Sequence, residues 1–183
     1  AVGRELMSGY GDGKFGPTDT LRRAQLAQVF YNWEQRPYSG ENEKKPWAGT
    51  TPFADVKAGA WYENAVNWAR SEKVMQGDGS SFNPDRDLNR QEMAVAPYGF
   101  AGYKGVSQDG GADLSAYSDC SDVASLAENA VSWAVDKKMF HIEGNALAPT
   151  APVQRAELAC ALMNMVMNAG EVDQTRLMAG AWM

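Results

Sequence analysis

The chain repeats one ordered set of short motifs three times, and this internal repeat limits its fold more than any other feature. The fullest copy reads FADV at Phe53–Val56, WYENAVNWA at Trp61–Ala69, VMQGDGSSFNP at Val74–Pro84 and LNRQEMA at Leu88–Ala94. A shift of 67 residues aligns Arg23 with Arg90, and a shift of 65 residues aligns Arg90 with Arg155. A fixed period of this length is typical of stacked supersecondary units, each of which needs its neighbours to bury its apolar face.

Because one repeat is too short to bury a core of its own, we expect a single domain over residues 1–183. Its parts are repeat one (1–36), repeat two (53–103), repeat three (117–170) and a tail (171–183). Ala1–Gly9 aligns with Ala69–Gly77, so we expect repeat one to be incomplete at its N-terminus. The segments Arg36–Pro52 and Lys104–Ala116 are rich in Gly, Ser, Pro and charged residues, and we interpret them as connectors.

Composition excludes some classes of function. A net charge of −6 argues against broad binding to nucleic acid or to acidic membranes, and no apolar run reaches the length of a membrane span. One histidine and two distant cysteines give no zinc pattern, and we predict neither metal nor cofactor. Cys120 and Cys160 either pair in an oxidising compartment or remain isolated buried thiols, and the sequence leaves both open.

Each full repeat reads as helix, glycine-rich loop, helix, which predicts an all-α fold. In repeat two, Trp61, Trp68 and the alanines near them recur at helical spacing, and we expect Gly77 to stop this helix. Asn89 and Glu92 fit a capping box at the start of the second helix. Pro97 should bend or end that helix.

The second helices are apolar and regularly spaced, so we predict that they meet around a pseudo-threefold axis as a central bundle. They are expected near Gln25–Trp33, Glu92–Phe100 and Glu157–Val166. The tail Glu171–Met183, with Leu177 and Trp182, is expected to pack back over the surface left open by the incomplete repeat.

Three arginines are the principal candidate ligand-binding residues: Arg23, Arg90 and Arg155. Each is expected in the first turn of a second helix, where a guanidinium beside unpaired backbone N–H groups suits a carboxylate or phosphate. The alternative is a structural salt bridge with a nearby aspartate, for which the candidates are Asp19, Asp85 and Asp87.

Glycine and tryptophan complete the candidate site. Gly9 and Gly77 would let a ligand approach the backbone, and Trp68 and Trp133 would stack on a sugar ring, although core packing is the stronger interpretation of both tryptophans. The Asp-Gly loops lack the alternating oxygen ligands of a calcium site, so turn formation explains them better. No catalytic triad can be assembled around the single histidine, and we expect no enzyme activity.

These motifs resemble the S-layer homology repeat. The family shows an F-x-D-V start, a W-Y or W-A pair, a G-x-x-D-G-x-F-x-P loop and an I-T-R-A-E segment. Their counterparts here are Phe53–Val56, Trp61-Tyr62, the loops Gly9–Pro17 and Gly77–Pro84, and the segments Arg22–Gln25, Asn89–Glu92 and Gln154–Glu157. Repeat one lacks the opening motifs, and repeat three has Ile142 at the loop glycine and Leu147 in place of Phe82.

The resemblance implies a bacterial cell-surface protein whose three repeats surround a helical bundle and bind secondary cell-wall polysaccharide, often one that carries a pyruvate ketal. We therefore predict a non-catalytic anchoring module for an acidic wall polysaccharide. The alternative is a structural module that contacts other surface-layer proteins without binding glycan. Because repeat two has the best-preserved motifs, Arg90 is expected to matter most for binding and Arg155 least.

Overall fold

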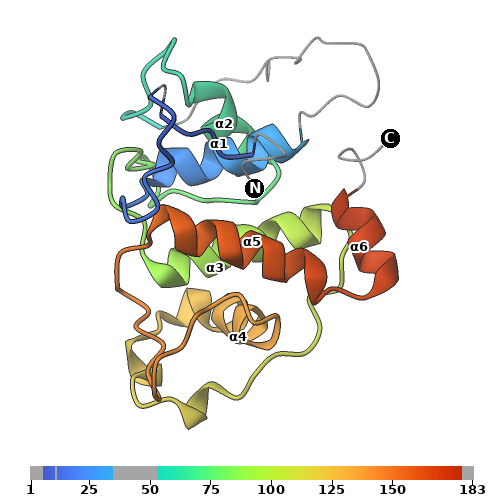
Figure 1. Cartoon of the computed structure of the whole chain (residues 1–183). Coiled ribbons are helices and arrows are strands. Elements are labelled where there is room, and N and C mark those ends of the chain that lie inside the picture. The colour runs from blue at the N-terminus through green and yellow to red at the C-terminus, as the bar shows by residue number, and fades with distance from the viewer. Residues whose placement is uncertain (1–5, 11, 35–52, 179–183) are drawn as a thin grey trace.

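The computed structural model describes residues 6–10, 12–34 and 53–178 as helices joined by loops (Figure 1). The longer helices are α1 (Arg23–Glu34), α3 (Arg90–Tyr103) and α5 (Arg155–Met167). Shorter helices are α2 (Glu63–Ser71), α4 (Glu128–Asp136) and α6 (Glu171–Met178), with 3₁₀ turns η2 (Leu114–Ala116), η3 (Cys120–Asp122) and η4 (Ser125–Ala127). Only isolated β-bridges occur among the described residues, so the predicted all-α class is confirmed.

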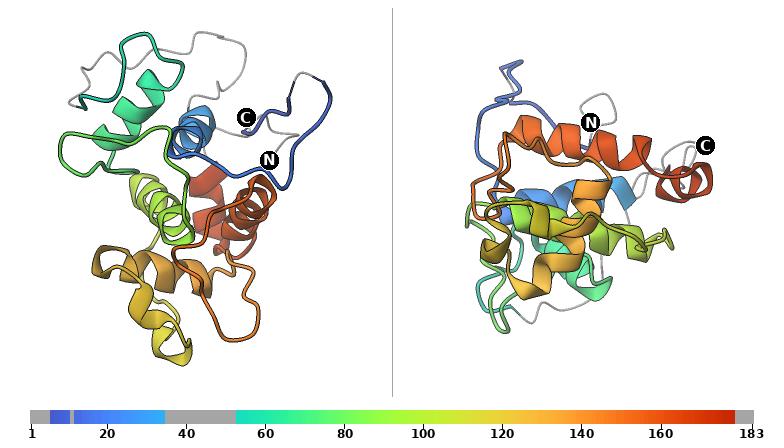
Figure 2. Two further views of the ribbon diagram at one scale, coloured as in Figure 1. Left: turned by 90° about the vertical axis from the view of Figure 1, so that its left-hand side faces the viewer. Right: turned by 90° about the horizontal axis from the view of Figure 1, so that it is seen from below.

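The second helices of the three repeats lie together at the centre of the molecule. Seen nearly end-on in Figure 2, left, α1, α3 and α5 form a triangle, and α3 contacts both of the others. Their facing sides carry fully buried side chains, among them Phe30, Phe100 and Leu158. Burial of such residues contributes on the order of 1.5–3 kcal/mol each, so this seam is one source of the stability of the fold.

Each short opening helix covers the second helix of the preceding repeat. Helix α2 of repeat two packs on α1, and α4 of repeat three packs on α3. In the first pair the Trp68 ring lies 5.8 Å from the ring of Tyr31, and in the second the Trp133 ring lies 5.7 Å from the ring of Tyr98. The repeats are therefore interlocked, because each of these opening helices packs chiefly on the second helix of the preceding repeat.

A ring of backbone hydrogen bonds joins the three repeats where their second helices begin. The Leu21 N–H donates to the Val153 carbonyl at 2.9 Å, the Val153 N–H to Leu88 at 2.9 Å, and the Leu88 N–H to Leu21 at 2.7 Å. These three residues are related by the same shifts of 67 and 65 that relate the arginines. Each repeat thus satisfies backbone groups of the next, and the third closes on the first.

The first helices end differently from the expectation. Helix α2 ends at Ser71, before Gly77, and the left-handed backbone that turns the chain away belongs to Lys73 with φ 59°. Lys138 takes the same conformation after α4, with φ 55°. A lysine in this region is uncommon, so glycine content alone could not locate the turn.

The start of α3 confirms the predicted capping box. The Asn89 side chain accepts from the Glu92 N–H at 3.0 Å, and the Glu92 carboxylate accepts from the Asn89 N–H at 3.2 Å. Gln154 makes no such bond at the start of α5. Helix α3 continues through Pro97 to Tyr103, so Pro97 does not end the helix, and the expected bend stays a prediction.

The tail packs back on the domain over its described part. Helix α6 contacts α5, Leu177 is fully buried, and the Leu177 carbonyl accepts from the indole N–H of Trp33 at 3.0 Å. Trp182 and the first connector (36–52) lie outside the described residues. Both cysteines are free thiols here, and Cys160 is exposed rather than buried.

Candidate ligand grooves between repeats

Each of the three arginines extends from the start of its own helix into the glycine-rich loop of the next repeat. Backbone carbonyls of that loop accept hydrogen bonds from two N–H groups of the arginine. Arg23 donates from Nε to the Phe82 carbonyl at 2.9 Å and from Nη2 to the Gln76 carbonyl at 2.8 Å. Arg90 donates from Nε to Leu147 at 2.8 Å and from Nη2 to His141 at 3.0 Å. Arg155 donates from Nε to Phe15 at 2.9 Å and from Nη2 to Ser8 at 2.6 Å. The order is cyclic, with repeat one reaching into two, two into three, and three into one.

An aromatic ring lies beneath each guanidinium. The Cζ atom stands 4.8 Å from the ring centroid of Phe82 for Arg23, 4.8 Å from that of Phe140 for Arg90, and 4.8 Å from that of Phe15 for Arg155. All three arginines are at least nine-tenths buried. Burial lowers the pKa of Arg23, and the neighbouring Glu92 opposes this shift. The planar fork fits this position because it bonds in its plane and stacks on its face.

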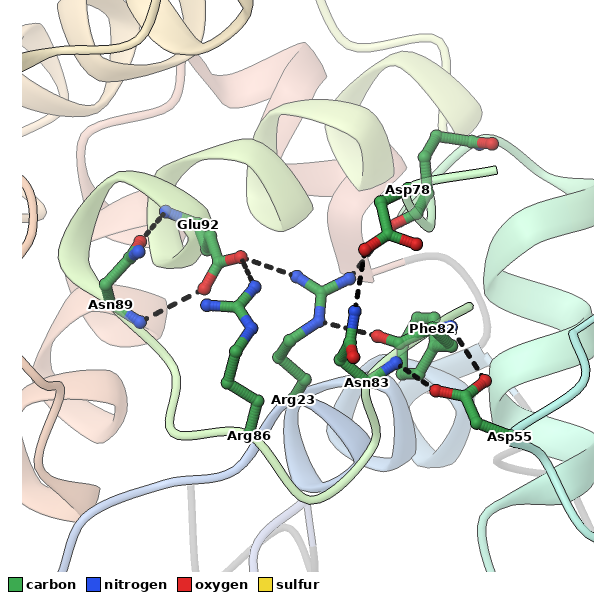
Figure 3. A network of polar contacts seen from close by, with 9 residues as sticks. Arg23, Asp55, Asp78, Phe82, Asn83, Arg86, Asn89 and Glu92 are labelled. Carbon is green, nitrogen blue, oxygen red and sulfur yellow. Dashed lines mark hydrogen bonds and ion pairs between the residues drawn. The ribbon is translucent and has the colours of Figure 1, made fainter. Parts of the chain in front are cut away.

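The three arginines differ in the partner of Nη1, the guanidinium nitrogen that does not bond to the loop carbonyls. Arg23 Nη1 donates to the Glu92 carboxylate at 2.7 Å, and Glu92 is shared with Arg86 (Figure 3). Arg90 Nη1 pairs with Glu157 in the same way. The residue that corresponds to these glutamates in repeat one is Gln25. Among the described residues, no carboxylate forms an ion pair with Arg155.

A groove lies beside each arginine. Groove one, with a volume of about 200 Å³, is lined by Arg155, Met7, Ser8, Gln25, Gln28 and Trp61 among others. Groove two, about 570 Å³, is lined by Arg23, Gln76, Arg86, Glu92, Val95 and Leu126 among others. Groove three, about 480 Å³, is lined by Arg90, Phe140, His141, Glu157, Cys160 and Asn164 among others. Each combines an arginine of one repeat with the loop and second helix of the next.

In grooves one and two, an exposed apolar residue comes from the opening segment of a further repeat. Trp61 of repeat two lines groove one with 62% of its surface exposed, and Leu126 of repeat three lines groove two fully exposed. Trp68 and Trp133, by contrast, lie in the core on the faces that contact α1 and α3. Neither buried ring is open to a sugar, whereas Trp61 is an exposed aromatic that lines groove one. Trp61 precedes the start of α2 at Glu63, and helical spacing groups it with Trp68, so no signal in the sequence separates the two tryptophans.

The two glycines serve their own loops. A Cβ at Gly9 would stand 2.8 Å from the Lys14 carbonyl oxygen, and one at Gly77 would overlap the Ser81 carbonyl and the Phe53 ring. Both positions therefore require glycine for the loop to close on itself, rather than for access of a ligand.

The aspartate of the opening motif, which was not among the predicted site residues, holds the loop in repeats two and three. Asp55 accepts from the Phe82 N–H at 2.9 Å and the Asn83 N–H at 2.7 Å. In repeat three, Asp119 accepts from the N–H groups of Leu147 at 2.8 Å and Ala148 at 2.7 Å. The Leu147 hydrogen bond lowers the pKa of Asp119. These contacts hold in place the two loops whose backbone carbonyls accept hydrogen bonds from Arg23 and Arg90.

Nothing in the described part of the chain gathers three or more His, Cys, Asp or Glu side chains as a metal site. Over the same residues, no helix is both long and apolar enough to cross a membrane. The polar chemistry of the grooves is that of recognition, with guanidinium, amide and carbonyl groups around an open hollow.

Comparison with known proteins gives one family. The S-layer homology domain matches residues 1–27 and 52–94. An amylopullulanase of Thermoanaerobacterium thermosulfurigenes is 27% identical over 92% of this chain and 9% of its own length. A surface-layer 125 kDa protein of Lysinibacillus sphaericus is 28% identical over 93% of this chain and 13% of its own length. The exoglucanase XynX of Acetivibrio thermocellus is 26% identical over 89% of this chain and 14% of its own length. The chain thus spans only a small part of these relatives, and two of its segments are similar to the S-layer homology domain.

Proposed function

We propose that this chain is a non-catalytic anchoring module at the bacterial cell surface, which holds its parent protein to the wall by binding an acidic secondary cell-wall polysaccharide. The same domain type accompanies proteins named as glucan-degrading enzymes and as surface-layer proteins. What these relatives share with the chain is therefore attachment rather than one reaction.

The observation that carries the proposal is the partly unpaired guanidinium in groove one. Arg155 donates to two carbonyls but, among the described residues, pairs with no carboxylate, whereas Glu92 and Glu157 occupy that role for Arg23 and Arg90. An acidic substituent on a sugar, such as a pyruvate ketal, would supply the missing charge. A charge-assisted hydrogen bond of this kind contributes on the order of 1.5–3 kcal/mol.

Trp61 supplies a stacking surface on the same groove. Groove one places this exposed indole near the Arg155 guanidinium. The apolar face of a sugar ring would stack on the indole, while an acidic substituent of the same sugar would point toward the guanidinium. This proposal changes the order expected from the sequence: Arg155 and groove one come first, and Arg90, already paired with Glu157, comes later.

The test is co-sedimentation with purified bacterial sacculi, before and after chemical removal of the wall polymer. Gln25→Glu is the informative variant, because it reproduces in groove one the neutralisation that Glu92 and Glu157 provide in the other repeats. Ser80→Glu adds the same charge in an exposed loop of repeat two and is the matched control. We expect binding to the intact sacculi only, weakened about tenfold or more by Gln25→Glu and unchanged by Ser80→Glu.

A structural module for a surface lattice is the second candidate. Leu126, fully exposed in groove two, favours an apolar protein contact there rather than a sugar. If the parent does not bind intact sacculi but self-associates, and Leu126→Ser abolishes that association, the lattice role replaces the anchoring role.

A further inference from the structure

One position of the repeat lies at the start of each arginine's helix. In all three seams the backbone N–H of the arginine donates to the carbonyl of this position, at 3.0 Å from Arg155 to Asp19, 3.1 Å from Arg23 to Arg86, and 3.0 Å from Arg90 to Ala151. Asp19, Arg86 and Ala151 are related by the same shifts of 67 and 65 residues. The side chain at this position is therefore acidic only beside Arg155, the arginine that lacks an ion pair in the described part of the chain.

A side chain at this position can reach the surroundings of the groove arginine. In repeat two, Arg86 pairs with Glu92, the carboxylate that also accepts from Arg23 (Figure 3). Asp19 carries the opposite charge to Arg86, and it is one of the aspartates that the sequence offers as a salt-bridge partner. A pair between Asp19 and Arg155 would compete with an acidic ligand for the guanidinium.

The structure gives the Asp19 carboxylate a different partner. The Tyr10 hydroxyl donates to it at 2.6 Å, and a hydrogen bond to a charged acceptor is roughly twice as strong as a neutral one. This bond raises the pKa of the Tyr10 hydroxyl, which therefore keeps its proton and donates at neutral pH. The Tyr10 ring also lies against Arg155, whose Cζ atom stands 5.2 Å from the ring centroid. Tyr10 thus contacts both the acid and the cation.

A glycine makes room for this arrangement. Gly16 has left-handed backbone, with φ 63°, and a Cβ there would overlap both the Asp19 carboxylate and the Tyr10 ring. Any larger residue would displace one of the two. The loop of repeat one is therefore shaped around the contact between Tyr10 and Asp19.

We propose that Tyr10 is a positioning residue of groove one: by holding the Asp19 carboxylate, it keeps this acid from pairing with Arg155 and leaves the guanidinium for an acidic group of the wall polymer. The inference rests on the proposed function, because it explains why groove one offers an unneutralised cation. Without Tyr10 the groove would resemble the other two, in which Glu92 and Glu157 already occupy their arginines.

The experiment compares Tyr10→Phe, Asp19→Asn and the double variant in co-sedimentation with intact sacculi. Tyr10→Phe keeps the ring against Arg155 but releases Asp19, so it should weaken binding about threefold to tenfold, because an internal ion pair must open before the ligand can bind. Asp19→Asn should bind at least as tightly as the parent, and the double variant should bind like Asp19→Asn.

This pattern separates positioning from a stiffening role of the same hydrogen bond. If the bond only stiffened the loop, the second substitution would not restore the binding lost in Tyr10→Phe, and that result overturns the proposal. Tyr103→Phe is the matched control, because it removes another tyrosine–carboxylate bond, the one to Glu34 at 3.0 Å, away from groove one. It should leave binding unchanged, and each variant is checked for an unaltered midpoint of thermal unfolding.

A second measurement needs no wall polymer. The Nε–H resonance of Arg155 in the nitrogen-15 spectrum of the free chain should move in Tyr10→Phe and return in the double variant. A resonance that stays in place in Tyr10→Phe overturns the proposal, whatever the binding assay gives. A parent that fails to bind intact sacculi, or that is insensitive to Gln25→Glu, counts against the proposed function instead. The free-chain spectrum then still decides whether Tyr10 keeps Asp19 from Arg155.

Discussion

At the scale of single residues, the arginines join structure to recognition, and the two roles must be separated by experiment. Arg90 bonds to two carbonyls and to Glu157 while lying over Phe140. We predict that Glu157→Ala, which leaves this cation buried without its partner, lowers the free energy of unfolding by about 3–5 kcal/mol. Urea unfolding measures the loss. A change below about 1 kcal/mol would show that Arg90 keeps enough contact with water to need no carboxylate.

Asp119 gives a residue-scale prediction in pH. Its pKa is lowered in the folded chain from an ordinary value of 3.8, chiefly because the Leu147 N–H donates to the charged form. A lowered folded pKa means that the stabilisation is present above pH 3.8 and is lost as the pH falls through the folded value. Asp119→Asn should therefore destabilise the chain at pH 7 and much less at pH 2–3. Equal destabilisation at both pH values, in urea titrations at each, would contradict this.

The sequence located these side chains better than it located their partners. It placed Arg23, Arg90 and Arg155 correctly in the first turns of helices, because caps and apolar periodicity are local signals. It offered nearby aspartates as partners, but the ion pairs run to Glu92 and Glu157 of another repeat. Contacts across a seam depend on how repeats dock, which a periodic sequence does not specify.

At the scale of elements, the second helices differ in their N-terminal capping, and substitutions at the cap positions can test this difference. Asn89 closes a full capping box, whereas Gln154 has the same extended backbone, with φ −89° and ψ 156°, and no side-chain bond. Asn89→Ala should cost about 0.5–2 kcal/mol. Gln154→Asn should gain a fraction of that, because Glu157 already stands at the required position. Thermal unfolding of the two variants should move in opposite directions, and a common direction would refute the assignment.

Substitutions in the core of the central helices should lower the free energy of unfolding more than substitutions at the helix caps. Leu158 is fully buried and Leu162 nearly so, whereas Met163 and Met167 of the same helix are exposed. Either leucine changed to alanine should lower the free energy of unfolding by about 2–5 kcal/mol. Met163→Ala, at an exposed position, serves as the control and should cost much less. Similar losses at all three positions would mean that Met163 is also buried in solution.

The elements also show where periodicity suffices and where it fails. Apolar spacing predicted the second helices closely, because buried residues such as Phe30 and Phe100 recur along them. The same spacing could not tell Trp61 from Trp68 by role, although one is exposed and the other forms the contact with α1. Only the direction of a helix face, known once α2 is docked, separates a groove residue from a core residue.

At the scale of the whole molecule, the repeats are joined as a closed cycle rather than a row. Arg23 reaches into repeat two, Arg90 into repeat three and Arg155 back into repeat one, and the backbone ring of Leu21, Leu88 and Val153 closes alongside them. In a linear array a terminal repeat can unfold alone, because it has one neighbour. In a closed cycle each repeat has two neighbours, so the unfolding of one repeat exposes apolar surface on both of them.

This closure predicts that the chain unfolds as one cooperative unit. Tryptophan fluorescence, which reports on all three repeats through residues such as Trp33, Trp68 and Trp133, should give the same midpoint in urea as far-ultraviolet circular dichroism, which reports on all helices. Glu92→Ala, which removes the partner that Arg23 and Arg86 share at a single seam, should move both curves together to lower urea. Arg22→Ala, which removes only an exposed pair with Asp85, should leave both nearly in place. If Glu92→Ala separates the two curves, one repeat unfolds before the others, and the cycle of contacts is too weak to make them a single folding unit.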